Sequence, residues 1–216
     1  SVYKEALVRI PLSTLNRHGL VAGATGTGKT KTLQKLSESL SREGVSVLVM
    51  DVKGDFSGIS QPGEMNDKIK ARQDAIGLPW VPTSFPVEFL TISRATGVKM
   101  RATVSEFGPV LFSKVLDLND TQASVTSLIF KYCDDKGLLL LDLKDFKKAL
   151  QYLTNEGKVE IAKEYGAISS TTTSTIMRKI IEIEEQGADT FFCEMSFDVL
   201  DLCRQDTKGR GIVNVF

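Results

Sequence analysis

HGLVAGATGTGKTKTLQKLSESLSREGVSVLVMD, residues 18–51, decides the fold. The short apolar run HGLVAG predicts a strand that leads into a glycine-rich loop. Leu33, Leu36 and Leu40 then recur at helical spacing, and Gly44 supplies a C-terminal stop for the helix. VSVLVMD is a continuous apolar run, typical of a strand that is buried on both faces of a parallel sheet. Together these segments predict a strand, loop, helix and strand, which is the first unit of an α/β fold.

The glycine-rich loop matches the pattern GxxxxGK[ST] in full at Gly23, Gly28, Lys29 and Thr30. Its glycines leave successive backbone N–H groups free to converge on a phosphate, and the following helix directs its N-terminus at the same anion. Lys29 is placed to bridge the β- and γ-phosphates, which makes it the predicted catalytic residue, and Thr30 to hold Mg²⁺. The predicted nucleotide contacts are Gly23, Ala24, Thr25, Gly26, Thr27, Gly28, Lys29, Thr30 and Lys31. The pattern therefore predicts a P-loop NTPase.

Hydrolysis also needs an acidic residue on a neighbouring strand, close to the metal ion. Asp51 ends the strand VLVMD and is the predicted metal ligand beside Thr30, and Asp55 is a weaker candidate. LLLLD, which ends at Asp142, shows the same pattern, but it runs into LKDFKKAL and is better interpreted as a helix cap. FFCE, which ends at Glu194, is a third and weaker candidate.

Composition excludes several classes of protein. Lys and Arg together number 27, as do Asp and Glu, so a polyanionic partner would need a local basic patch. Three cysteines and the single His18 have no zinc-site spacing, and an odd number of cysteines fits reduced thiols in a cytosol. No apolar run reaches the roughly 18 residues of a membrane span, and the first residues do not resemble a secretion signal. We therefore expect a cytoplasmic protein with no membrane partner.

The rest of the chain predicts an interrupted core. ALVRIPL, residues 6–12, alternates like a short strand, and PVEFLTI and VKMRATV are separated by SRATG and predict a hairpin or sheet-edge pair. The chain then turns mainly helical, and GIVNVF is again strand-like. The predicted helix caps are Asn119 or Asp120, Asp142, and Ser169 or Ser170. The expected division is a P-loop core at 1–60, a loop and hairpin at 61–107, a helical insertion at 108–205 and a returning core strand at 206–216, with the domain truncated.

Several stretches together resemble one family of ATPases. They are residues 19–63 with the element DVKGDFSG, then SEFGPVLFSKVLDLNDTQ, DDKGLLLLDLKDF and the late GRGIVNVF. The chain is similar along nearly its whole length to the HerA/FtsK superfamily, and most similar to the bacterial HerA-like, YjgR-type branch, in the N-terminal part of the ATPase domain.

The resemblance implies a RecA-like, three-layer αβα core that binds ATP and Mg²⁺. It implies a ring, usually a hexamer, that couples ATP hydrolysis to movement of DNA as a helicase-like translocase, and a nuclease partner. In the family pattern the strand ending at Asp51 is not the Walker B strand. The Walker B pair would follow GIVNVF and one further helix, beyond Phe216, so we expect this fragment to bind ATP and to need further elements for hydrolysis.

Two other functions use the same loop: a small-molecule kinase, and an interaction module whose assembly is regulated by a nucleotide. Neither an arginine-rich lid nor a guanine-reading [NT]KxD element is evident in the sequence. Local basic groups are more often solvated faces than nucleic-acid contacts; they are Arg94, Lys99, Arg101, Lys144, Lys147, Lys148, Lys208 and Arg210. The candidates for an arginine finger, among which the sequence does not choose, are Arg178, Arg204 and Arg210.

Overall fold

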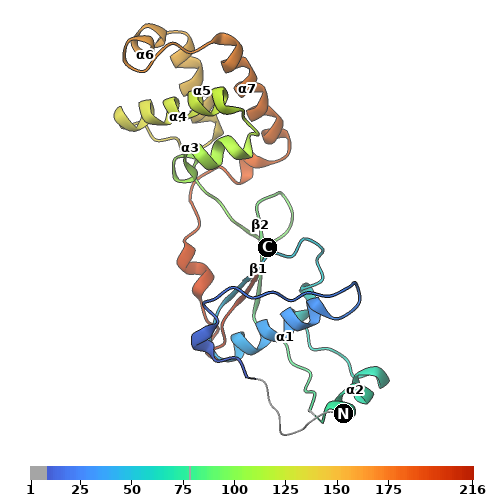
Figure 1. Cartoon of the computed structure of the whole chain (residues 1–216). Coiled ribbons are helices and arrows are strands. Elements are labelled where there is room, and N and C mark those ends of the chain that lie inside the picture. Colours follow the sequence, from blue (N-terminus) through green and yellow to red (C-terminus); the bar gives the residue numbers. More distant parts are fainter. Residues whose placement is uncertain (1–8, 78) are drawn as a thin grey trace. The chain divides into compact units, whose positions relative to one another are not determined.

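The computed structural model describes residues 9–77 and 79–216, which fall into two compact units (Figure 1). We call Ser1–Phe89 with Val199–Phe216 the core unit and Leu90–Asp198 the helical unit. The helical unit includes residues 108–198 of the insertion predicted at 108–205, and its hydrophobic core begins at Val104. Of the strand predicted at 6–12, residues 6–8 lie outside the described residues, and residues 9–12 form no strand.

A parallel sheet of four strands confirms the α/β class predicted from the sequence. The order across the sheet is β1, β4, β2, β3, and every pairing is parallel. Val213 of β4 pairs with Val47 on one side and Val87 on the other, so the strand reached last in the chain lies between β1 and β2. The strands are β1 (Val47–Val49), β2 (Val87–Thr91), β3 (Val98–Lys99) and β4 (Val213–Val215).

Two strand predictions are wrong. Residues 18–23 form no strand, and Leu20 is 89% exposed. A β-strand is defined by its hydrogen bonds to a neighbouring strand. None of the described strands pairs with residues 18–23. PVEFLTI and VKMRATV do pair, but in parallel, with Leu90 opposite Val98, so they are not a hairpin. The Lys99 amine donates to the carbonyls of Ser93 and Ala95 and so closes the loop between the two strands.

The core unit also contains two α-helices, α1 (Lys29–Arg42) and α2 (Asp67–Ile76). α1 confirms the predicted helix after the glycine loop, whereas α2 lies in a region predicted to be loop and hairpin. Asn66 caps α2 by accepting from the Ile69 N–H at 3.0 Å, and Gly77 ends it in the left-handed conformation. α2 buries none of its residues, so it lacks the apolar periodicity that would have revealed it. Short 3₁₀ helices complete the unit: η1 (Leu12–Thr14), η2 (Ser57–Ser60) and η4 (Val199–Cys203).

Five α-helices build the helical unit around one hydrophobic core (Figure 1). The predicted caps Asn119 and Asp142 each form a reciprocal capping box, with Gln122 and Asp145 respectively. Ser169 stands at the predicted start of the last helix but makes no side-chain cap bond. The elements are α3 (Val104–Val115), α4 (Asp120–Asp135), α5 (Leu143–Thr154), α6 (Lys158–Glu164), α7 (Ser170–Glu185) and η3 (Ala188–Thr190). None of the helices in the described part of the chain is long and apolar enough to cross a membrane.

We expect Cys133 of α4 to be the least reactive thiol in this protein, because it is buried. Desolvation raises the pKa of Cys133 to about 11, whereas Cys203 is exposed. At pH 8 a thiol with that pKa is ionised in only about one molecule in a thousand, and the thiolate is the nucleophile. Iodoacetamide followed by mass spectrometry should label Cys203 first and Cys133 only after denaturant is added. Equal labelling of the two thiols in the native protein would contradict this packing of α4.

Candidate functional site

The glycine-rich loop between residue 22 and α1 folds back on itself. The Thr27 hydroxyl and backbone N–H both donate to the Ala24 carbonyl, at 2.8 and 3.4 Å. Gly28, the residue that precedes α1, has φ 94°, a left-handed conformation that favours glycine. A Cβ on Gly23 would lie 2.5 Å from the Thr27 hydroxyl oxygen, so the turn also needs glycine at its start. The loop thus has the tight turn and bare backbone predicted from its spacing.

Lys29 extends back over this loop. Its Nζ donates to the Ala24 carbonyl at 2.9 Å, although Lys29 itself is the first residue of α1. The ammonium group is therefore held directly against the loop that the sequence assigns to phosphate. A phosphate oxygen bound there would offer the same ammonium a charged acceptor, which makes a stronger hydrogen bond than a neutral carbonyl does.

The N-terminus of α1 suits an anion. Gly28 provides no side-chain cap, and the first turn contains no acidic residue, so its backbone N–H groups have no side-chain acceptor there. These groups and the helix dipole favour a negative charge. Thr30 is half-buried, and within the described residues its hydroxyl makes no hydrogen bond. Open amides, an ammonium and a hydroxyl fit a nucleotide phosphate with its Mg²⁺.

The other end of α1 is fixed to Gly211, two residues before β4. Ser41 is fully buried, and its hydroxyl donates to the Gly211 carbonyl at 2.5 Å. The Gly211 N–H donates back to the Ser41 carbonyl at 2.8 Å. A Cβ on Gly211 would lie 2.1 Å from the Val45 carbonyl oxygen, so only glycine allows this close approach to the turn after α1. These contacts fix the C-terminal end of α1 against the residues that lead into β4. The glycine loop precedes the opposite end of the same helix.

Asp51, the predicted metal ligand, lies just after β1 and shapes the loop that follows. Its two carboxylate oxygens accept from the backbone N–H groups of Gly54 and Phe56, at 3.0 and 2.8 Å. A carboxylate oxygen can accept more than one bond, so these contacts leave a role at a metal ion open. The metal role of Asp51 stays a prediction.

Gln34 lies beside the candidate site and was not predicted from the sequence. It is buried, its amide donates to the Asp55 carbonyl at 2.8 Å, and it accepts from the Lys31 amine at 2.9 Å. Lys31 and Gln34 thereby join the first turns of α1 to the loop after β1. The Lys31 side chain is engaged with Gln34, so the predicted nucleotide contact of Lys31 rests on its backbone N–H. The buried side chains of α1 are Gln34, Ser37 and Ser41 and not its leucines, so the leucine spacing gives no signal of this role.

The remaining acidic candidates have other positions. Asp142 caps α5, as predicted, and Glu194 is exposed in the helical unit. Among residues 9–77 and 79–216, no group of three or more His, Cys, Asp or Glu side chains could hold a metal ion. Two candidate arginine fingers are engaged within the core unit, because Arg204 pairs with Glu88 and Arg210 with Asp206.

The chain matches a known protein family. The model of the family described as "Helicase HerA-like C-terminal" matches residues 2–216, which include the glycine loop, the sheet and the helical unit. No curated protein matches the chain.

Proposed function

The chain belongs to the Helicase HerA-like C-terminal family, and from this premise we propose that it binds ATP and Mg²⁺ at residues 23–31 as the ATPase part of an oligomeric motor. The observation that carries the proposal is the Lys29 ammonium folded over the glycine loop at the uncapped N-terminus of α1. We further propose the finer features that the resemblance implies: the YjgR-type branch, a RecA-like three-layer core, a hexameric ring, DNA as the polymer moved, and a nuclease partner.

Each residue of the site has a defined task in this proposal. The backbone N–H groups of the glycine loop and of the first turn of α1 hold the β-phosphate. The Lys29 amine turns from the Ala24 carbonyl to the β- and γ-phosphates and stabilises the charge that develops when the terminal phosphoryl group leaves. The Thr30 hydroxyl and the Asp51 carboxylate are the metal-side residues. Bound Mg²⁺ would supply the positive charge that neutralises the phosphate oxygens.

Magnesium dependence tests the proposal without relying on turnover. We expect ATP to bind the wild-type chain more tightly with Mg²⁺ than without it. In Thr30→Ala the gain from Mg²⁺ should fall by about tenfold, because a metal ligand is lost. Isothermal titration calorimetry with and without Mg²⁺ gives both dissociation constants.

Thr32→Ala is the matched control for this experiment. Its hydroxyl lies on the same helix but donates to the Gly28 carbonyl at 3.1 Å. The control should therefore keep the wild-type response to Mg²⁺. Binding that Mg²⁺ does not strengthen in the wild-type chain, or an equal loss in Thr30→Ala and Thr32→Ala, would contradict the proposed site. Acceleration of hydrolysis by DNA would separately support a motor acting on DNA.

A further inference from the structure

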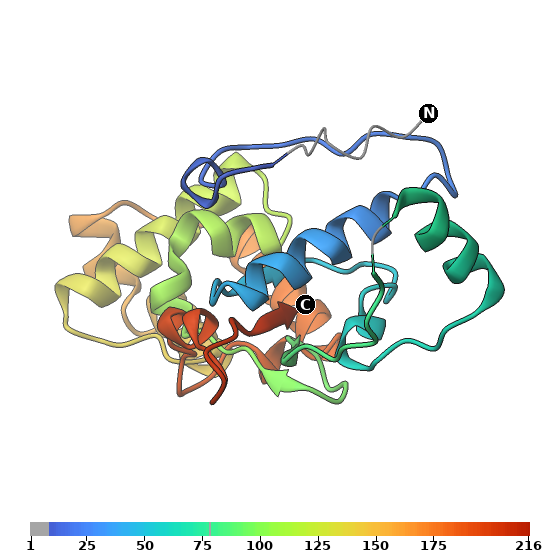
Figure 2. The ribbon, with the colours of Figure 1, turned by 90° about the horizontal axis from the view of Figure 1, so that it is seen from below.

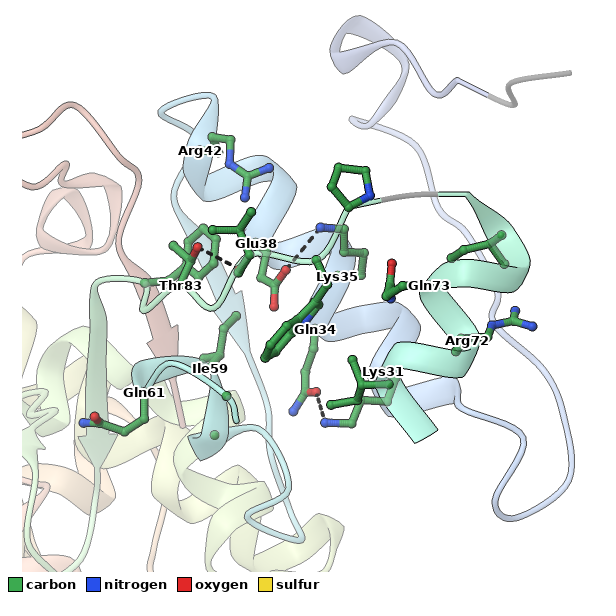
Figure 3. Close-up of a pocket in the computed structure, with 18 of the residues that line it drawn as sticks. Lys31, Gln34, Lys35, Glu38, Arg42, Ile59, Gln61, Arg72, Gln73 and Thr83 are labelled. Carbon is green, nitrogen blue, oxygen red and sulfur yellow. Dashed lines mark hydrogen bonds and ion pairs between the residues drawn. The ribbon is translucent and has the colours of Figure 1, made fainter. Parts of the chain in front are cut away.

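Gln34 makes two hydrogen bonds that join α1 to the loop after β1. Its side chain is only 7% exposed, and its amide nitrogen donates to the backbone carbonyl of Asp55 at 2.8 Å. Its amide oxygen accepts from the Lys31 amine at 2.9 Å. Figure 3 shows the bond to Lys31 as a dashed line, with the amide nitrogen of Gln34 turned away from it. Both ends of this buried amide are therefore bonded within the core unit.

Lys31 fixes the direction of the Gln34 amide. The oxygen and the nitrogen of such an amide have nearly the same shape, so packing alone does not choose between the two orientations. An ammonium group only donates, so Lys31 holds the oxygen end and leaves the NH₂ group for the Asp55 carbonyl. The change Gln34→Glu would keep the bond to Lys31 and lose the bond to Asp55, because a carboxylate has no hydrogen to donate.

The loop that Gln34 holds begins at Asp51. Both carboxylate oxygens of Asp51 accept from backbone N–H groups of this loop, those of Gly54 and Phe56. The position of the loop therefore sets the direction of the Asp51 carboxylate. Phe56 is a further anchor of the loop, since its side chain is buried in the hydrophobic core of the core unit. Figure 2 shows the loop, in cyan, running next to α1.

The contact from Gln34 lies one helical turn from Thr30. Residues four apart on a helix share a face, so Thr30 and Gln34 are on the same side of α1. Thr30 and Asp51 are the two residues proposed for the metal side of the site. Gln34 thus ties the loop that begins with Asp51 to the helix face that carries Thr30.

We propose that Gln34 is a positioning residue: through the Asp55 carbonyl it sets the direction of the Asp51 carboxylate, and so determines how strongly Mg²⁺ raises the affinity for ATP. The inference rests on the proposed function, because it needs ATP and Mg²⁺ at residues 23–31. Lys29 and the amides of the glycine loop, which hold the phosphates in that proposal, take no part in this link. Binding of ATP without Mg²⁺ is therefore almost independent of Gln34.

Gln34→Glu tests this role, because it keeps the size of the side chain and the bond to Lys31. The variant should reduce the gain in ATP affinity from Mg²⁺ by about tenfold, and should change ATP binding without Mg²⁺ by no more than about twofold. Calorimetric titrations with and without Mg²⁺ measure both effects. Gln34→Met removes both hydrogen bonds without adding a charge, and it should reduce the gain from Mg²⁺ in the same way.

Ser41→Ala is the matched control. It also removes a buried hydrogen bond from α1 to a backbone carbonyl, that of Gly211, but at the end of the helix away from the glycine loop. This variant should lose stability, as Gln34→Met does, and keep the wild-type gain from Mg²⁺. If Gln34 contributed to stability alone, the two variants would respond to Mg²⁺ alike.

Hydrogen exchange tests the same link with no nucleotide present. In the free protein the N–H groups of Gly54 and Phe56 are held by Asp51, and loss of the bond to Asp55 should let the loop open more often. Peptides that cover residues 52–58 should exchange about tenfold faster in Gln34→Glu and Gln34→Met than in the wild-type chain or Ser41→Ala. Mass spectrometry of the exchanged peptides measures this difference.

Three results would overturn the inference and leave the proposed function standing. One is unchanged exchange of residues 52–58 in both Gln34 variants. Another is a gain from Mg²⁺ that both variants keep while Thr30→Ala loses it. The third is a loss confined to Gln34→Glu, which would mean that the added charge acts directly on the phosphates. A wild-type chain whose ATP binding Mg²⁺ does not strengthen would contradict the proposed function and this inference together.

Discussion

Lys29→Ala is expected to weaken binding of Mg²⁺·ATP by about two orders of magnitude, which corresponds to about 3 kcal/mol. The change removes the ammonium group that lies over the glycine loop, 2.9 Å from the Ala24 carbonyl. The phosphates would then lose their charged partner while the glycine turn remains. Equilibrium titration with a fluorescent ATP analogue, at constant Mg²⁺, gives the two dissociation constants.

Two control variants separate charge from loop shape. Thr27→Val removes the other side-chain donor to the same Ala24 carbonyl but leaves the charge, so it should weaken binding far less than Lys29→Ala does. Lys35→Ala removes a lysine from α1 that is paired with Glu38 and should leave binding unchanged. If Thr27→Val and Lys29→Ala have equal effects, Lys29 acts by shaping the loop and not by binding phosphate.

Phe112→Ala should lower the free energy of unfolding of the helical unit by about 3–5 kcal/mol. Phe112 is fully buried and meets three other rings, with centroid distances of 4.9 Å to Phe146, 5.5 Å to Phe192 and 5.8 Å to Phe130. Its removal leaves a cavity where helices α3, α4 and α5 meet. Urea denaturation followed by far-ultraviolet circular dichroism measures the change, because most helical residues belong to this unit.

The single tryptophan makes the experiment specific to one unit. Trp80 lies in the core unit, so its fluorescence should report a transition that Phe112→Ala shifts much less. Val110→Ala, also in α3 but at a side chain 65% exposed, should change stability by no more than about 0.5 kcal/mol. A loss below about 1 kcal/mol in Phe112→Ala would mean that these aromatic contacts do not hold the unit together.

The sequence predicted best those features that depend on short-range pattern. The glycine loop, α1, and the helix caps at Asn119 and Asp142 follow from a few residues at fixed spacing, and the structure contains all of them. The strand VSVLVMD and the late strand GIVNVF were also recognised, although the ordered strands are shorter. Local geometry and apolar runs suffice for such elements.

The features that the sequence did not predict depend on contacts between residues far apart in the chain, or belong to a helix that buries none of its side chains. The hairpin prediction failed because strand direction is decided by the whole chain path, and residues 18–23 failed because no partner strand pairs with them. α2 has no buried face to produce a periodic pattern. Gln34 is tied to Asp55, 21 residues away, by a hydrogen bond that no motif encodes.

The placement of β4 sets the order in which the protein can fold during synthesis. The hydrophobic core of the core unit joins Phe56, Ile59 and Phe85 to Val213 and Val215, on the far side of the entire helical unit. At translation rates of about 5–20 residues per second, the first three wait on the order of ten seconds for the last two. The helical unit, whose core lies entirely between residues 104 and 192, can fold in that interval. The segment that carries the glycine loop therefore leaves the ribosome before the helical unit does, but its core closes after that unit is complete.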